Sequence, residues 1–148
     1  MIAETEVYKL LSADEELNTL LDTFRGGKFG NGFKQGIFTH AIPEHPVSVI
    51  KKELAPFIRI NANYDNPAHY SDDTCIATEY RVIVNFWCET SDQSEQIAKA
   101  IDRILSEAGY DRYTAGEKPR YKDGDIDLLM NIRKYRFFEW KTKENEEQ

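Results

Sequence analysis

The chain has 148 residues, of which 41% are hydrophobic and 30% charged, and its formal net charge is −7. This length and apolar content suit a single soluble domain with one core. The negative charge disfavours nucleic-acid binding, and no stretch approaches the ~20 consecutive apolar residues that span a bilayer. Residues 1–11 hold two glutamates where a signal peptide would be basic, so we expect a cytosolic protein whose partners are proteins.

The N-terminal segment has the pattern of an amphipathic helix. Between residues 4 and 22 apolar side chains recur at every third or fourth position, namely at Val7, Leu10, Leu11, Leu17, Leu20 and Leu21. Ser12 followed by Glu15 has the form of a capping box, so we expect two short helices that meet at Ser12. Residues 25–33 then hold four glycines, which predicts a flexible Gly-rich segment over residues 25–36.

The middle of the chain predicts short strands. Residues 36–42 and 57–62 are strand candidates, and Pro43 and Pro46 interrupt the chain between them. Residues 61–74 are rich in Asn, Asp, Ser and Pro, which is typical of a loop or hairpin connection.

The strongest pattern is a strand followed by a helix. From Thr78 onward, alternate apolar residues predict one long strand with one buried face, formed by Tyr80, Val82, Val84, Phe86 and Cys88. Ser91 and Asp92 are possible N-caps of a helix that Gly109 ends. Its apolar stripe consists of Ile97, Ala98, Ile101, Ile104, Leu105 and Ala108.

The C-terminal part predicts a short strand over residues 110–114, a polar loop over 115–127 and a last long strand over 128–140. The charged residues 141–148 should be frayed. We therefore predict one α+β domain over residues 1–140. Its mixed, largely antiparallel sheet is packed by the N-terminal helical segment and one long amphipathic helix.

Two motifs suggest ligand binding and fail on spacing. The glycines at positions 26, 27, 30, 32 and 36 match neither a phosphate-binding loop nor a dinucleotide fingerprint. Asp123, Asp125 and Asp127 resemble the opening of a calcium loop, but Leu128 replaces its glycine and Lys134 replaces its glutamate. These patterns exclude an EF-hand and favour a turn before the last strand.

Candidate catalytic residues are equally isolated. If the protein were an enzyme, its best candidate catalytic residues would be His40, His45 and the Asp72–Asp73 pair. Their spacing in the sequence does not imply that these side chains meet in one site. The same holds for a metal site that adds His69. Cys88 falls on the apolar side of a strand, where thiols are usually inert, and Cys75 has no helix N-terminus to activate it. We expect no catalysis, no metal and no cofactor.

A mixed face of the strand from Thr78 is the most unusual feature. Trp, Tyr and Phe among polar neighbours are typical of protein interfaces, although the N-terminal helices could cover the same face. Both possibilities stay open from sequence alone. If the face is a subunit interface, its predicted residues are Ile83, Asn85, Trp87, Glu89, Tyr135 and Phe137, with Phe29 and Phe33 from the Gly-rich segment.

The order of elements resembles a known family. An N-terminal helix precedes Pro56-Phe-Ile-Arg-Ile60, the strand Glu79-Tyr-Arg-Val-Ile-Val-Asn-Phe-Trp87, a helix opened by Ser-Asp-Gln-Ser-Glu95, and Asp125-Ile-Asp-Leu-Leu-Met130. This layout is similar to the tail-completion or tail-terminator proteins of long-tailed phages, the minor tail protein U-like group. The Gly-rich segment 25–36 and the insertion 40–54 depart from simpler members. Neighbouring head-tail joining proteins have related folds.

The resemblance implies a structural role. Subunits of that family form a ring, usually hexameric, that caps the tail tube and offers a docking face to the head connector. The expected partners are therefore further copies of the chain, the tail-tube protein and the connector, first in the host cytoplasm and then in the virion tail. The alternative is a small ferredoxin-like regulatory domain that binds a ligand or partner under its Gly-rich loop.

Overall fold

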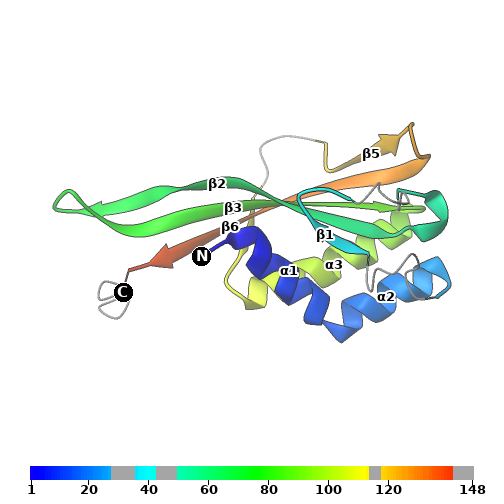
Figure 1. Cartoon of the computed structure of the whole chain (residues 1–148), viewed down its shortest axis with the longest axis horizontal. Coiled ribbons are helices and arrows are strands. Elements are labelled where there is room, and N and C mark those ends of the chain that lie inside the picture. The colour runs from blue at the N-terminus through cyan, green and yellow to red at the C-terminus, as the bar shows by residue number, and fades with distance from the viewer. Residues whose placement is uncertain (28–35, 43–49, 114–117, 142–148) are drawn as a thin grey trace.

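The computed structural model describes residues 1–27, 36–42, 50–113 and 118–141. Three helices lie on one side of a long, twisted sheet (Figure 1). The fold is α+β with a mixed, largely antiparallel sheet, which confirms the predicted class. The predicted Gly-rich segment falls largely outside the described residues, as do His45, Phe29, Phe33 and all of the predicted tail except Lys141.

The N-terminal segment forms two helices, α1 (Ala3–Ala13) and α2 (Glu15–Arg25). The expected break is present, but Asp14 makes it rather than Ser12. Asp14 has extended backbone angles, and its side chain accepts a hydrogen bond from the Leu17 amide at 2.9 Å. Because an aspartate directly precedes the helix, it caps α2 better than the more distant serine could. Gly26, at φ 80°, ends α2 in the left-handed conformation.

Helix α3 (Ser91–Glu107) follows its sequence pattern closely. Its N-cap is Thr90, one residue before the predicted caps, and the Thr90 hydroxyl accepts from the Gln93 amide. The predicted apolar stripe faces the sheet, and all of it except Ala108 is buried. Gly109 leaves the helix at φ 90°, a conformation that side chains disfavour.

The sheet has the order β1-β2-β3-β6-β4, with β5 also paired to β6. Short strands flank the long ones: β1 (Ile37–Thr39) runs parallel to β2, while β4 (Asp111–Tyr113) and β5 (Arg120–Asp123) run antiparallel to β6. β5 lies inside the segment predicted as a loop. A one-turn 3-10 helix, η1 (Lys52–Leu54), precedes β2.

The centre of the sheet consists of β2 (Phe57–Ser71), β3 (Thr74–Cys88) and β6 (Leu128–Trp140). Of the two possibilities for residues 61–74, the hairpin connection is correct and the loop is not, because β2 continues through this segment to a turn at Asp72–Asp73. Both turn residues have positive φ, which aspartate tolerates better than most side chains. The predicted long strands correspond to β3 and β6.

Two separate clusters of buried side chains lie on opposite faces of the sheet. The larger cluster joins the helices to the face that carries Val82, Val84 and Phe86. The smaller cluster lies at one end of the opposite face and includes Phe57, Trp87 and Met130. None of the helices α1, α2 and α3 covers that opposite face, which we call the open face (Figure 1).

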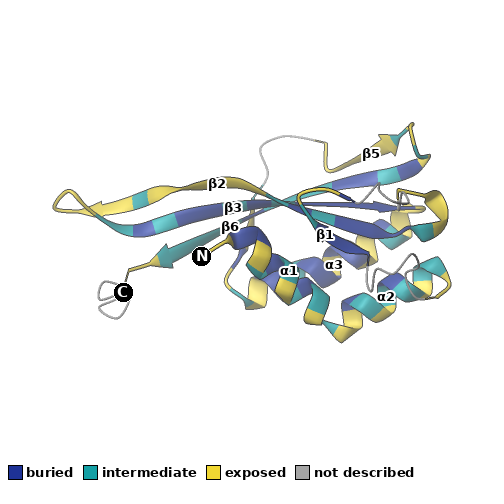
Figure 2. Cartoon of the chain, viewed as in Figure 1, coloured by how far each residue is buried: buried dark blue, intermediate teal, exposed yellow. Residues whose placement is uncertain are grey.

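Beyond the helices, β2 and β3 continue as a projecting hairpin, which we call the hairpin extension (residues 61–79) (Figures 1 and 2). Residues 62–71 of β2 are exposed except for the half-buried Ala68, so neither face of that strand has cover. The β2–β3 register shifts between Ala62 and Tyr64, and twice more between Pro67 and Tyr70. A polar strand with no buried face has no alternating apolar pattern, which explains why the sequence suggested a loop.

Candidate assembly surface

The open face carries part of the predicted interface. Paired residues of an antiparallel sheet share a face, so Ile83 and Asn85 lie beside Lys134 and Ile132 of β6. Ile83 is half-buried and Asn85 is buried. Glu89 is exposed just after the end of β3. The interface role of these residues stays a prediction.

Trp87 is covered by its own chain. Its side chain is only 7% exposed, and its Nε1 donates to Asp123 Oδ2 at 3.1 Å. Around it pack Phe57, whose ring centroid is 5.4 Å away, and Ile42 and Ala55. Of the two possibilities left open by the sequence, intramolecular cover therefore applies at Trp87. The cover comes from the segments on either side of η1 and from the segment before β6. Helices α1 and α2 do not contribute, since they lie on the other face.

Tyr135 and Phe137 lie on the helix-covered face, so grouping them with Ile83 and Trp87 is wrong. Tyr135 pairs with Val82 across the sheet and is 1% exposed. Its hydroxyl donates to Asp102 Oδ1 at 2.5 Å, and burial together with this bond raises the pKa of Tyr135. Phe137 stacks on Tyr110 at 4.9 Å. Both side chains therefore build the core beneath α3.

Arginine and aromatic side chains alternate along the open face. Arg59 lies 5.2 Å from the Trp87 ring centroid and donates to Asn85 Oδ1 at 3.1 Å. Arg81 lies between two tyrosines, 4.4 Å from the ring of Tyr64 and 5.2 Å from that of Tyr113. These stacks hold the guanidinium groups in fixed positions.

The series continues onto the hairpin extension. Arg136 lies 5.5 Å from the Phe138 ring, and His69 stacks on Trp140 at 4.9 Å. Two aromatic side chains here face solvent, since Trp140 is 51% and Tyr70 is 61% exposed. Exposed aromatic and arginine side chains together are the residue types that dominate binding energy at protein interfaces.

Sequence reasoning missed most of this surface because it assigned β6 to the wrong face. The strand order and register bring Arg59, Arg81 and Arg136 together from three strands. The residues of β6 that share a face with Ile83 are the set Met130, Ile132, Lys134, Arg136 and Phe138. The alternation of two sets of side chains along β6 was visible in the sequence. The pairing with β3, which determines which set lies on the open face, was not.

Of the candidate catalytic residues, His40 and the Asp72–Asp73 pair lie far apart. The His40 amide bonds to the Ile60 carbonyl, whereas Asp72 and Asp73 form the turn at the far end of β2, roughly 35–40 Å away along the strand. His40 lies 3.4 Å from Glu4 instead. Within the described residues, no three His, Cys, Asp or Glu side chains gather where they could hold a metal ion.

The remaining motif residues have structural partners. Asp123 Oδ1 accepts from the Asp125 amide, and Asp127 pairs with Lys52 and Lys122, so these acids shape a turn as expected. The Cys88 thiol is buried beside Ser94, and burial raises its pKa, which disfavours the reactive thiolate. Cys75 is half-buried.

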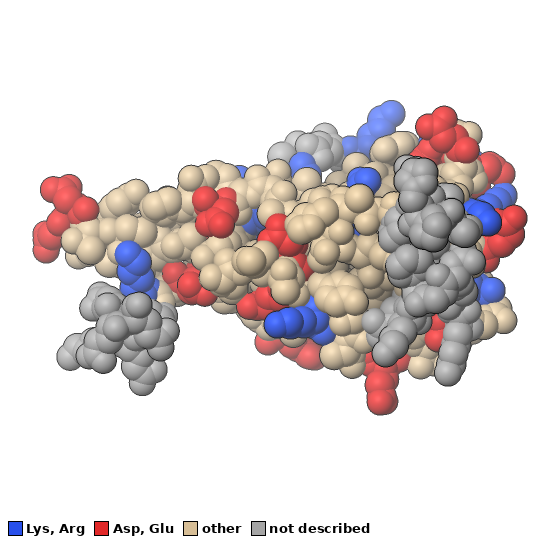
Figure 3. All heavy atoms as spheres, in the orientation of Figure 1, with Lys and Arg blue, Asp and Glu red and all other residues tan. Residues whose placement is uncertain are grey.

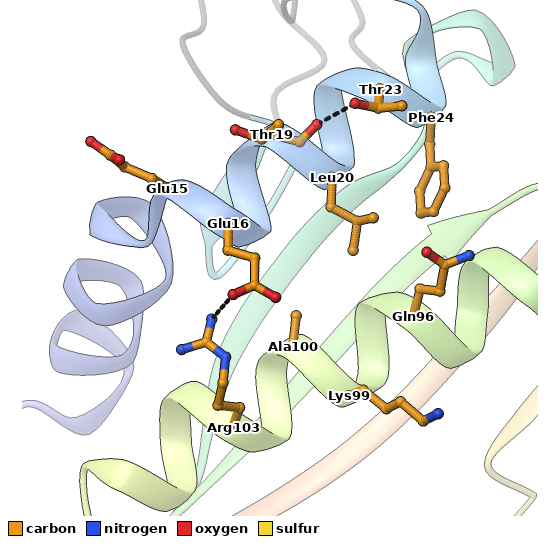
Figure 4. A pocket seen from close by; sticks show the side chains of 10 residues that line it. All are labelled: Glu15, Glu16, Thr19, Leu20, Thr23, Phe24, Gln96, Lys99, Ala100 and Arg103. Carbon is orange, nitrogen blue, oxygen red and sulfur yellow. Dashed lines mark hydrogen bonds and ion pairs between the residues drawn. The ribbon is translucent and has the colours of Figure 1, made fainter.

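A groove of about 830 Å³ separates α2 from α3 (Figure 4). Leu20 points from α2 toward Ala100 of α3, Phe24 points toward Gln96, and the two side chains give the groove its apolar floor. Charged side chains form the rim, where Glu16 reaches Arg103 at 3.5 Å. This groove lies on the side of the molecule opposite the open face.

Comparisons with known proteins give a likeness of fold and no match of sequence. No family model matches the sequence, and no curated protein matches it. Among solved structures, the fold is similar to "Structure of bacteriophage SPP1 gp17 protein", with a TM-score of 0.49 and 11% identity. The likeness covers 94% of this chain and 88% of that chain. At this level it assigns no role to any residue here. None of the helices in the described part of the chain is long and apolar enough to cross a membrane.

Proposed function

We propose that this protein is a structural subunit of a phage tail, which self-associates into a ring at the end of the tail tube and meets the head connector there. The element order motivates the proposal, because it resembles the tail-completion family. Its partners would be further copies of the chain, the tube protein and the connector. On this proposal the protein performs no catalysis and needs no cofactor.

One observation carries the proposal on physical grounds. The sheet extends past the helices, and the hairpin extension exposes a ten-residue stretch of strand almost completely, from Ala62 to Ser71. A monomeric protein gains little stability from such a strand, since burial of apolar surface is the main favourable term in folding. The exposed Tyr70 of this extension and the exposed Trp140, which ends the neighbouring strand β6, are well suited to a partner protein.

The test is the mass of the purified protein in solution over a concentration series, measured alone and with a tail-tube protein from the same genome. We expect a discrete oligomer, or a stable complex with the tube protein that forms one. Tyr70→Ser with Trp140→Ser should weaken either assembly while leaving the far-UV circular dichroism unchanged. A strict monomer that also ignores the tube protein would refute the proposal.

The groove between α2 and α3 favours one competing function, a ligand-binding regulatory domain. Its volume of about 830 Å³ lies within the range of small-molecule sites. A screen of nucleotides and metabolites by thermal shift distinguishes the two, because a ligand that binds only the folded state raises the melting temperature. A large shift with one compound, abolished by Leu20→Asp, would support this function instead.

A further inference from the structure

The charge of the molecule is unevenly distributed between its two sides. The helices and the Asp14 cap carry ten acidic and four basic residues, a formal net charge of −6 out of the −7 of the chain. Figure 3 shows acidic side chains along the helical side, at the bottom of the view. The acidic residues are Glu4, Glu6, Asp14, Glu15, Glu16, Asp22, Asp92, Glu95, Asp102 and Glu107.

The open face has the opposite character. Four basic residues occupy successive rows across its centre, namely Arg59, Arg81, Lys134 and Arg136. On this face Glu79 pairs with Arg81, and Asp111 lies opposite Arg136 on β4. At the end near Trp87, Asp123 and Asp125 line the same hollow as Arg59. The basic residues therefore gather around Arg81, Lys134 and Arg136, in a protein that is acidic overall.

We propose that the open face of one copy binds the helical side of a second copy. This inference rests on the proposed self-association and names the two surfaces that meet. Charge complementarity is its main support, because a basic and an acidic surface attract, whereas two open faces or two helical sides repel.

Apolar groups match as well as charges. The groove between α2 and α3 offers Leu20 and Phe24 within a charged rim, in which Glu15 and Glu16 of α2 face Lys99 and Arg103 of α3. The open face offers Ile83 and Ile132, both half-buried, and Tyr64, which is 36% exposed. An interface with an apolar centre and a charged rim is the usual arrangement between proteins.

The two surfaces lie on opposite sides of one sheet, so the contact has a direction. When subunits join through two different surfaces, the growing assembly always keeps an unoccupied open face at one end and an unoccupied helical side at the other. Such contacts form a closed ring when the rotation between subunits allows closure, and otherwise an open filament. A contact of the open face with itself would stop at a dimer.

Charge exchange tests the inference. The open-face variant is Lys134→Glu with Arg136→Glu, and the helical variant is Glu15→Lys with Glu16→Lys. In each variant by itself, the two surfaces that should meet carry charges of the same sign. We expect the dissociation constant for self-association to rise by roughly 100-fold. An equimolar mixture should assemble again, because alternating subunits restore attraction at every contact. Lys51→Glu with Lys118→Glu is the matched control, since both positions are exposed and neither is among the residues proposed to make the contact.

The outcomes separate this inference from the proposed function. If the wild-type protein assembles and the variants assemble equally well, the inference fails and the function stands. If only the open-face variant dissociates and the mixture gives no recovery, the open face binds itself, or another molecule such as DNA, and the inference again fails. A wild-type chain that never associates would overturn both. Lys134→Gln with Arg136→Gln removes the positive charges without adding negative ones, so it should weaken assembly less than Lys134→Glu with Arg136→Glu. Such a graded effect distinguishes loss of attraction from misfolding.

Discussion

Asp127 connects two segments that are distant in sequence. Its carboxylate accepts from Lys52 of η1 and from Lys122 of β5, each at 2.8 Å. These two lysines hold the pKa of Asp127 at about 2, below its ordinary value of 3.8. The pair fastens the segment around η1, which helps to cover Trp87, to the turn before β6.

The lowered pKa makes a prediction about acid stability. Because the folded state favours the charged carboxylate, Asp127 contributes stability above pH 3.8 that is lost as the pH falls through about 2. Asp127→Asn should lower the urea midpoint at neutral pH, and the difference from wild type should vanish near pH 2. Asparagine suits the backbone there, since φ is 59°.

Urea titrations from pH 2 to pH 7 at constant ionic strength measure the effect. Asp125→Asn, an exposed change in the same turn, is the control and should show no such pH dependence. If the urea midpoint of the wild type still exceeded that of Asp127→Asn by the same amount at pH 2, the ionised Asp127 carboxylate would not be the source of the difference.

Single residues show what a sequence can and cannot predict. Cys88 was expected to be buried and inert, and its buried position beside Ser94 agrees. Tyr135 was placed on the wrong side, because its role depends on Asp102 of α3 and Arg133 of its own strand. Nothing local in the sequence indicates that partner, since Asp102 lies 33 positions away.

Among the elements, the junction of α1 and α2 depends on Asp14. Its carboxylate caps α2 at the Leu17 amide, and it also pairs with Arg103 of α3, which donates to both oxygens at 3.0 Å. One side chain therefore sets where α2 begins and fixes the helix pair against α3.

Two substitutions separate these roles. Asp14→Ala removes the cap and the ion pair and should lower the free energy of unfolding by about 1–2 kcal/mol. Asp14→Asn keeps the cap, so it should cost less, about 0.2–1 kcal/mol for a partly exposed pair. Urea denaturation of both variants measures the difference. Equal losses would mean that the cap contributes nothing.

Elements with a buried face were predictable, and those without one were not. α3 and β3 each bury one face, so their apolar residues recur with the helix or strand period. The distal part of β2 has no buried face, and its polar residues resemble a loop. β5 is a four-residue strand with three exposed positions, and it left no pattern for the same reason.

At the scale of the whole molecule, the fold should survive without the hairpin extension. Replacing residues 67–78 by Asn-Gly joins Asn66 to Glu79, which are paired across the strands, through a favoured two-residue turn. Because most of the removed residues are exposed, we expect one cooperative thermal transition, lowered by only about 4 °C. The shortened protein should lose self-association.

Differential scanning calorimetry and mass measurement check both parts. Phe86→Ala provides the comparison, because Phe86 is fully buried and its loss should cost about 3–5 kcal/mol. If shortening the hairpin destabilised the protein as much as Phe86→Ala, the extension would belong to the folding core.

The irregular edge of β2 determines which kind of association this protein can undergo. A long bare strand is normally a template for further strands, the route by which chains stack into amyloid-like fibres. Here Pro67 lacks an amide hydrogen, and the register shifts on either side of it break the row of donors and acceptors. The protein can therefore display ten residues of uncovered strand at high concentration without fibre growth along that edge.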